Sequence, residues 1–169
     1  MNNVYLVGMM GSGKSVTGKK LAEYLGYPFV DLDEWIQQKT KRTIADIFEK
    51  EGEAHFRQVE TSALADVCRF RPVIVATGGG TILKSENVDR MKSSGKIIYL
   101  DTSVEFLWDR LKYKKDRPLL KDTNPREKLL RIYADRLPIY QRISDLQVRT
   151  DGETADTVAR KIISAIGSQ

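Results

Sequence analysis

The amino-acid sequence predicts an α/β fold built on a parallel β-sheet with helices on both faces. Short apolar runs alternate with segments of helical periodicity along the chain, which is the order of elements typical of such sheets. Three of these runs, Val4–Val7, Val73–Ala76 and Ile97–Leu100, are continuously apolar, as expected for strands that are buried on both faces. The length of 169 residues, with 41% hydrophobic and 30% charged residues, fits one globular domain spanning 1–169.

Each expected element follows from a local pattern. The runs expected to form strands are Val4–Val7, Pro28–Leu32, Val73–Ala76, Ile97–Leu100 and Leu146–Val148. The segments expected to be helical run from Val16 to Leu25, from about Asp33 to Cys68 and from about Thr154 to Ile166. Thr43 with Asp46 predicts a capping box at one helix start. Thr102 with Glu105 is expected to cap the helix after the fourth strand.

The composition argues against several classes of protein. No apolar run approaches the ~20 residues of a membrane span, and the short run Val4–Met10 has no basic residue before it, unlike a signal peptide. Cys68 is the only cysteine, which excludes an intramolecular disulfide and a cysteine-based metal site. We therefore expect a cytoplasmic protein with no membrane partner. Because no long exposed apolar stripe calls for a partner chain, we also expect a monomer.

The net charge of +5 has a local origin. Between Asp109 and Arg142, eleven basic and five acidic residues give +6, so the rest of the chain is near −1. Such concentrated charge fits an anionic small ligand at least as well as nucleic acid, whose binding proteins more often carry basic residues over one broad face. Because no aromatic-rich platform lies near this segment, we expect no nucleic-acid partner. Oligonucleotide binding with a steep salt dependence would favour that alternative.

The segment Gly8–Ser15 carries the clearest chemical signal. It matches the pattern G-x-x-x-x-G-K-[ST] of phosphate-binding loops, between a predicted strand and a predicted helix. Glycines let backbone N–H groups turn toward phosphate oxygens, and the helix N-terminus adds its dipole. Lys14 should reach the β- and γ-phosphates, and the Ser15 hydroxyl should bind Mg²⁺. ATP and Mg²⁺ are therefore the expected ligands. The nucleotide-binding residues expected here are Gly11, Ser12, Gly13, Lys14, Ser15 and Val16.

Two carboxylates, Asp31 and Asp33, follow the second predicted strand. On an extended strand, residues two apart point to the same side. Asp31 could support Mg²⁺ through water, and Asp33 could accept a hydrogen bond from a substrate hydroxyl. The alternative for Asp33 is capping of the next helix. The third strand ends in Thr77 rather than the acidic residue of a Walker B strand, which favours Asp31 as the support of the metal.

Three consecutive glycines, Gly78, Gly79 and Gly80, follow the third strand. A tight turn followed by a glycine helix cap would explain some of them. Three in a row exceed what a turn needs, so we predict that a ligand approaches the backbone closely there.

Three arginines are candidates for binding anions: Arg57, Arg117 and Arg136. A phosphate-loop kinase without an external arginine finger needs cations from its own chain. A planar guanidinium also binds a carboxylate or phosphate through two hydrogen bonds. Arg117 lies in the basic loop Lys114–Leu120, which we expect to act as a lid over the phosphates. For each arginine, a solvated surface charge is the alternative.

Six motifs, taken in order, resemble the shikimate kinase family. They are Gly8–Ser15, Asp31–Asp33, Gly52–Arg57, Thr77–Gly80, Arg117–Leu120 and Arg136–Tyr140. A phosphate loop alone is shared by many NTPases, whereas the joint order of these motifs is far more specific. The resemblance covers nearly the whole chain. It implies a three-layer α/β/α fold of the nucleoside-monophosphate-kinase type, with a five-stranded parallel sheet, substrate-binding helices at about 33–61 and a mobile lid at about 112–124.

The resemblance implies ATP-dependent phosphorylation of the 3-hydroxyl of shikimate. At the matching positions, Asp33 would position that hydroxyl, and Arg57 and Arg136 would clamp the carboxylate. Gly79 would contact the substrate through its backbone N–H, within the glycine stretch 78–80. Whether Asp33 removes the proton or only orients the hydroxyl stays open, because an ordinary aspartate is a weak base toward an alcohol. Another small-molecule kinase, for gluconate or a nucleoside monophosphate, is the alternative activity.

The resemblance also implies roles at the nucleotide. Lys14 and Arg117 would be catalytic cations, Arg117 coming from the lid, and Arg110 and Pro118 would lie near the adenine. Val16 stands where a threonine is common in the family, which removes a hydroxyl contact to the α-phosphate. The late loop at 151–153 lacks the basic residue often found beside the adenine.

Overall fold

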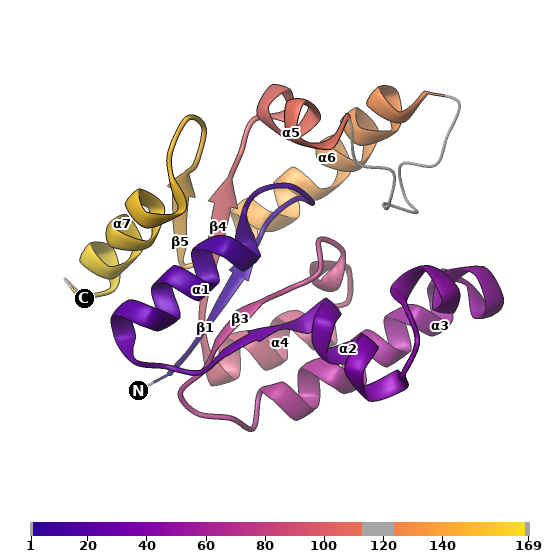
Figure 1. Cartoon of the computed structure of the whole chain (residues 1–169), viewed down its shortest axis with the longest axis horizontal. Coiled ribbons are helices and arrows are strands. Elements are labelled where there is room, and N and C mark those ends of the chain that lie inside the picture. Colours follow the sequence, from indigo (N-terminus) through magenta and orange to yellow (C-terminus); the bar gives the residue numbers. More distant parts are fainter. Residues whose placement is uncertain (1, 113–123, 168–169) are drawn as a thin grey trace.

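Five parallel strands form the central sheet, in the order β2-β3-β1-β4-β5 (Figure 1). The strands are β1 (Asn3–Val7), β2 (Phe29–Asp31), β3 (Ile74–Ala76), β4 (Gly95–Asp101) and β5 (Leu146–Arg149). The computed structural model describes residues 2–112 and 124–167. Each strand overlaps the run predicted for it, so the parallel five-stranded sheet is confirmed.

Helices cover both faces of the sheet. They are α1 (Lys14–Leu25), α2 (Leu32–Thr40), α3 (Ile44–Val67), α4 (Ser85–Ser94), α5 (Val104–Leu111), α6 (Pro125–Ile143) and α7 (Ala155–Gly167), with a short 3₁₀ turn η1 at Thr81–Leu83. Helices α1 and α7 pack together on one face, and α3, α4 and α6 lie on the other (Figure 1). The predicted three-layer α/β/α architecture is therefore confirmed. None of these helices in the described ranges is long and apolar enough to cross a membrane.

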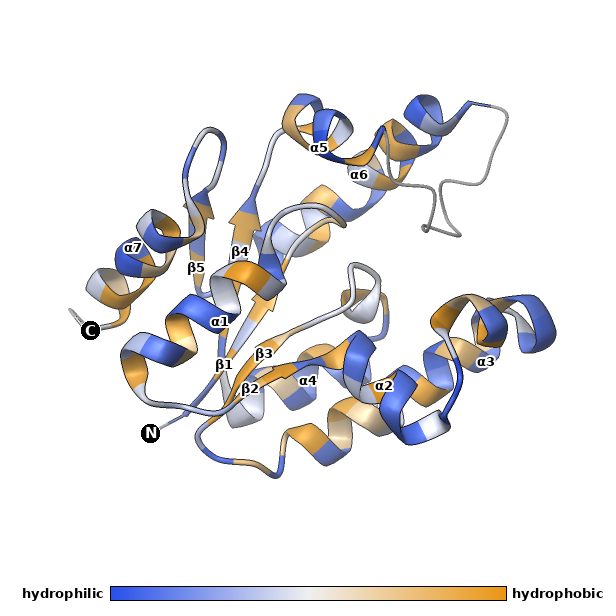
Figure 2. Cartoon of the chain, viewed as in Figure 1, coloured by the Kyte–Doolittle hydropathy of each residue, from blue (hydrophilic) through white to orange (hydrophobic). Residues whose placement is uncertain are grey.

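The alternation of side chains along β1 explains why the strand is continuously apolar. Tyr5 and Val7 belong to the core shared with α2 to α6, whereas Val4 and Leu6 pack with α1 and α7. Both faces of the strand are therefore buried. Figure 2 shows hydrophobic residues concentrated on the central strands. The register places Tyr5 between Val75 of β3 and Ile97 of β4, so the three inner strands end close together.

Helix starts were predicted with mixed success. The capping box of Thr43 and Asp46 is present at the start of α3. The expectation that Thr102 and Glu105 cap α5 is wrong: the Ser103 hydroxyl accepts from the Phe106 N–H instead. Thr102 does not cap α5 because its hydroxyl is hydrogen-bonded to the hydroxyl of Thr150 at 2.6 Å. This bond links the segments that follow β4 and β5.

The placement of the two aspartates also differs from the prediction. Strand β2 ends at Asp31, and α2 begins at Leu32. Asp33 therefore lies in the first turn of a helix and not on an extended strand beside Asp31. The cap of α2 is Asp31, whose Oδ1 accepts from the backbone N–H groups of Asp33 and Glu34. The alternative that Asp33 itself caps the helix is thus excluded.

Candidate functional site

The loop between β1 and α1 has the backbone that a phosphate cradle requires. Gly11 and Gly13 adopt φ values of +82° and +90°, which side chains with a Cβ rarely tolerate. The Lys14 ammonium lies inside the loop and donates to the carbonyls of Gly8 at 2.9 Å and Met9 at 2.8 Å. The first turn of α1 follows directly, so backbone N–H groups and a cation converge at one point.

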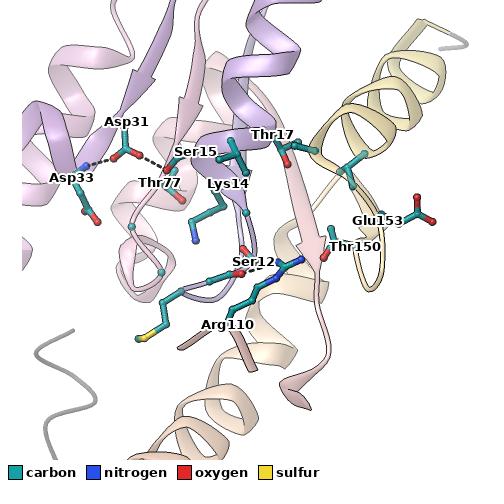
Figure 3. A pocket seen from close by; sticks show the side chains of 18 residues that line it. Ser12, Lys14, Ser15, Thr17, Asp31, Asp33, Thr77, Arg110, Thr150 and Glu153 are labelled. Carbon is teal, nitrogen blue, oxygen red and sulfur yellow. Dashed lines mark hydrogen bonds between the residues drawn. The ribbon is translucent and has the colours of Figure 1, made fainter. Parts of the chain in front are cut away.

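A cavity of about 340 Å³ opens above this loop. Its walls come from segments that follow β1, β2, β3 and β5, together with α5 (Figure 3). The labelled side chains around it are Ser12, Lys14, Ser15, Thr17, Asp31, Asp33, Thr77, Arg110, Thr150 and Glu153. The expected meeting of the strand-end clusters at one crevice is therefore observed, as is usual for open parallel sheets.

Asp31 joins the phosphate loop to α2. Its Oδ2 accepts a hydrogen bond from the Ser15 hydroxyl, while its Oδ1 caps α2 (Figure 3). A hydroxyl and a carboxylate beside a phosphate loop are the donor set expected for Mg²⁺, which keeps most of its ligands as water and phosphate oxygens. Within the described ranges, no cluster of three or more His, Cys, Asp or Glu side chains could hold a metal ion. The Ser15 hydroxyl and the Asp31 carboxylate fit a magnesium ion that shares its other ligands with a nucleotide.

A second cavity, of about 80 Å³, adjoins the first. The two share Met10, Asp33, Gly78 and Gly79. The second cavity is also lined by Ile44, Phe48, Phe56, Arg57, Glu60, Gly80 and Arg136. Apolar rings and two guanidinium groups thus surround a space that opens onto the phosphate loop, with the Asp33 carboxylate at the junction. A small molecule with an anionic group and a hydroxyl would fit this chemistry.

Arg57 is held in place by two carboxylates. Its Nη1 donates to Glu60 at 2.9 Å, and its Nη2 donates to Glu53 at 3.0 Å. Burial by itself lowers the pKa of Arg57, but the charges and hydrogen bonds of Glu60 and Glu53 outweigh it and raise the pKa above the usual value. Glu60 is fully buried, and its other oxygen accepts from the Thr81 hydroxyl at 2.6 Å. The guanidinium therefore keeps its charge and a fixed orientation.

Arg136, by contrast, has an unsatisfied donor. The residue is only 6% exposed, and its Nη1 has no hydrogen-bond partner among the described residues. The Nε of Arg57 is also buried and has no hydrogen-bond partner among the described residues. A buried donor without a partner costs about 1–3 kcal/mol, so each position is suited to an acceptor supplied by a ligand. A carboxylate matches the planar guanidinium best.

At each of the three glycines after β3, a charged side chain lies close to the backbone, in or near the space that a Cβ would occupy. A Cβ on Gly80 would lie 2.4 Å from Nη2 of Arg57, and one on Gly78 would lie 2.7 Å from Oε1 of Glu60. A Cβ on Gly79 would lie 3.3 Å from Nη1 of Arg136. The sequence predicted close approach by a ligand, and the structure shows that the protein's own side chains require the same space.

Gly80→Ala is expected to raise the KM for the acceptor substrate about tenfold. The added Cβ needs the position of the Arg57 guanidinium, which must then leave Glu60 and Glu53, while the Gly80 backbone itself (φ −103°) accepts alanine. Steady-state kinetics would measure the change. Gly167→Ala is the control, because nothing lies within 4 Å of its Cβ position. An unchanged acceptor KM in Gly80→Ala would contradict this account.

Comparison with known proteins assigns the family. The family model described as shikimate kinase matches residues 10–167. The chain belongs to the shikimate kinase family. It is 44% identical over 167 residues to a shikimate kinase of Nostoc sp. (strain PCC 7120), covering 98% of this chain and 91% of the relative. It is 40% identical to one of Vibrio campbellii, covering 97% and 95%.

Solved structures agree with this assignment to the shikimate kinase family. The shikimate kinase from Acinetobacter baumannii in complex with shikimate superposes with a TM-score of 0.97 at 41% identity, covering 99% of this chain and 94% of that one. A gluconokinase from Sinorhizobium meliloti 1021 superposes with a TM-score of 0.68 at 18% identity, covering 99% and 92%. At that identity, the likeness to the gluconokinase concerns the fold alone.

The structure brings most of the residues predicted from the shikimate kinase resemblance into the two cavities. The first gathers the phosphate-loop residues with Asp31, and the second gathers Arg57 and Arg136 with the glycine stretch, Asp33 being common to both. Val16 is 58% exposed at the rim of the first cavity. Arg117 and Pro118, with positions 113–123 of the expected lid, lie outside the described residues.

Three further residues belong to the site although the sequence did not predict a role for them. Glu60 orients Arg57, and the signal for it was available, because residues three apart share a helix face. Thr150 lines the first cavity, although no local pattern marked it. Tyr140 is the last residue of the motif Arg136–Tyr140, for which no role of the tyrosine was predicted. Its hydroxyl donates a hydrogen bond to the Gly79 carbonyl.

Proposed function

We propose that this protein transfers the γ-phosphoryl group of ATP to the 3-hydroxyl of shikimate. The observation that carries the proposal is the junction at Asp33: a cavity with two buried arginines opens there onto a phosphate loop, in a chain of the shikimate kinase family. Shikimate is a small hydroxylated carboxylate, and it is bound to the related Acinetobacter baumannii enzyme. Membership of this family also favours shikimate over gluconate or a nucleoside monophosphate as the acceptor.

The phosphate loop would bind the nucleotide. Backbone N–H groups at Gly11–Lys14 and the Lys14 ammonium provide positive charge for the β- and γ-phosphates. Arg110 lies at the other end of the cavity, where its Nη1 donates to the Gly11 carbonyl at 2.9 Å. We place the adenine on that side, between Arg110 and the loop that carries Thr150 and Glu153.

The second cavity would hold shikimate. Arg57 and Arg136 would bind its carboxylate through the donors that lack partners, and Phe48, Phe56 and Met10 would contact the ring. Asp33 would accept a hydrogen bond from the 3-hydroxyl of shikimate. This bond would orient the hydroxyl oxygen toward the γ-phosphate of the nucleotide. This orientation would supply most of the catalysis, since phosphoryl transfer depends mainly on positioning and charge neutralisation.

The transfer itself exchanges one bond for another. The shikimate 3-oxygen forms a bond to the γ-phosphorus while the bond from that phosphorus to the β–γ bridging oxygen breaks, which leaves ADP. The hydroxyl proton departs late, toward the Asp33 carboxylate, because the nucleophile gains little bonding in a loose transition state. Lys14 would neutralise charge that builds on the leaving phosphate.

Ser15 and Asp31 are the residues proposed to hold Mg²⁺. These two residues would hold Mg²⁺ beside the phosphates, where it would supply positive charge that neutralises the phosphate oxygens. The Ser15 hydroxyl faces this region, and Asp31 lies directly behind it. We propose Ser15 as a direct ligand and Asp31 as a partner through water.

Asp31→Asn and Asp31→Ala are expected to separate the two contacts of this side chain. Asparagine is a good helix cap, so Asp31→Asn should raise the Mg²⁺ concentration needed for half-maximal rate about tenfold while shikimate KM stays within about twofold. Asp31→Ala should also lower the free energy of unfolding by about 1 kcal/mol and raise shikimate KM, because α2 carries Asp33. Rates against Mg²⁺ and thermal unfolding would measure both. Identical behaviour of the two variants would contradict the dual role.

A substrate panel tests the proposed function. ADP release, coupled to NADH oxidation, would be followed with shikimate, gluconate and nucleoside monophosphates. We expect turnover with shikimate only. Absence of shikimate-dependent turnover by folded protein would overturn the proposal. The roles of Arg117 and Pro118, the lid, and the cytoplasmic monomer stay predictions.

A further inference from the structure

Tyr140 lies at the contact between α6 and the glycine stretch. Its side chain is fully buried, and its hydroxyl donates to the Gly79 carbonyl at 2.5 Å. The ring stacks on Tyr99 of β4, with 5.0 Å between centroids and 8° between planes. A phenylalanine would fill the same space and stack equally well. The hydroxyl is therefore the part of Tyr140 that packing does not explain.

The surroundings keep this hydroxyl protonated. Burial raises the pKa of Tyr140 well above its usual value, and the positive charge of Arg136, the hydrogen bond between Arg136 and the phenol, and the charge of Arg57 oppose the rise only in part. The phenol consequently remains a hydrogen-bond donor over the whole physiological pH range. Its acceptor, the Gly79 carbonyl, belongs to the peptide that joins Gly79 to Gly80.

The same stretch of backbone touches both arginines of the second cavity. The Cβ positions of Gly79 and Gly80 lie 3.3 Å from Nη1 of Arg136 and 2.4 Å from Nη2 of Arg57. Arg136 lies four residues before Tyr140 on α6, so the two side chains share one face of the helix. A rotation of the peptide between Gly79 and Gly80 would therefore disturb the space of both guanidinium groups.

We propose that the Tyr140 hydroxyl is a positioning group for the acceptor site, fixing the peptide after Gly79 against α6 so that Arg136 and Arg57 keep the geometry that binds a carboxylate. The inference rests on the proposed function in naming shikimate as the acceptor. Tyr140 acts through Gly79 and through its own interaction with Arg136, and it does not touch the reacting atoms. Loss of its hydroxyl should consequently affect shikimate binding and leave the nucleotide site unchanged.

Tyr140→Phe tests this directly, with Tyr99→Phe as the matched control. Tyr99 is the other ring of the stack and is 1% exposed, but its hydroxyl bonds to Asp101 at 3.3 Å and not to the glycine stretch. We expect Tyr140→Phe to raise shikimate KM, and shikimate Kd by calorimetry without nucleotide, about five- to tenfold. We expect kcat and ATP KM to stay within about twofold. Tyr99→Phe should leave all four values within about twofold.

The outcomes separate this inference from the proposed function. If the wild-type protein neither binds nor phosphorylates shikimate, both fail. If it does and Tyr140→Phe binds shikimate equally well, the positioning role alone is wrong. Equal losses in Tyr99→Phe, or parallel rises in shikimate and ATP KM, would indicate a purely structural role and also overturn it. Placing 4-aminophenylalanine at position 140 returns a donor and is a second test: recovery of shikimate Kd to within about twofold supports the role, and no recovery contradicts it.

Discussion

Asp33→Asn is expected to lower kcat about 100-fold while ATP binding changes by less than about twofold. Asparagine has nearly the same shape, but it lacks the negative charge that orients the acceptor hydroxyl and receives its proton. Groups of this kind contribute about 10²–10⁴-fold to rates, and 100-fold corresponds to about 2.7 kcal/mol of transition-state stabilisation. Asp33 lies at the junction of the two cavities, so the effect should fall on the transfer step. Single-turnover kinetics with saturating substrates would measure it.

Glu34→Gln is the matched control for this change. Glu34 is the next acidic residue in the first turn of α2, and its side chain is exposed. It should keep kcat within about twofold. Much weaker ATP binding in Asp33→Asn would place Asp33 outside the acceptor site and contradict the assignment.

Arg136→Ala is expected to raise shikimate KM about 10- to 150-fold with a small change in kcat. The Nη1 donor of Arg136 is buried and has no partner among the described residues, so its partner should be the substrate carboxylate. A hydrogen bond to a charged group is worth about 1.5–3 kcal/mol, and each 1.4 kcal/mol is tenfold in affinity. Because the carboxylate is bound in both ground and transition states, the loss should appear in KM.

Arg131→Ala controls for the loss of positive charge on α6. Arg131 is 75% exposed and pairs with Glu127 on the surface of the helix. Its removal should leave shikimate KM within about twofold at physiological salt. An unchanged KM in Arg136→Ala would remove that residue from the clamp.

The elements with strong local signals were predicted from the sequence. The phosphate loop could be located because its glycines, lysine and serine have a fixed spacing between a strand and a helix. The inner strands β1, β3 and β4 could be located because burial on both faces makes them largely apolar, whereas the edge strands β2 and β5 are only partly buried and include polar residues. The α4 helix was not predicted, since its sequence is mostly polar and only three of its residues are buried.

The errors arose where one residue decides between two local structures. Asp31 and Asp33 have the same spacing on a strand or across a helix start, and only the observed cap on Asp31 distinguishes them. Thr102 and Ser103 are both good helix caps, and the pairing of Thr102 with Thr150 across 48 residues decided between them. Contacts over such distances have no local signal, and this applies equally to the link from Tyr140 to Gly79.

The most direct test of the central claim is the identity of the phosphorylated product. The full-length protein would be incubated with ATP, Mg²⁺ and shikimate, and the product would be examined by ¹H and ³¹P NMR. We predict one new phosphate ester, coupled to the proton on carbon 3 of the ring and formed in equal amount to ADP. Phosphorylation at another hydroxyl, or ADP formation without any ester of shikimate, would contradict the placement of the acceptor beside Asp33.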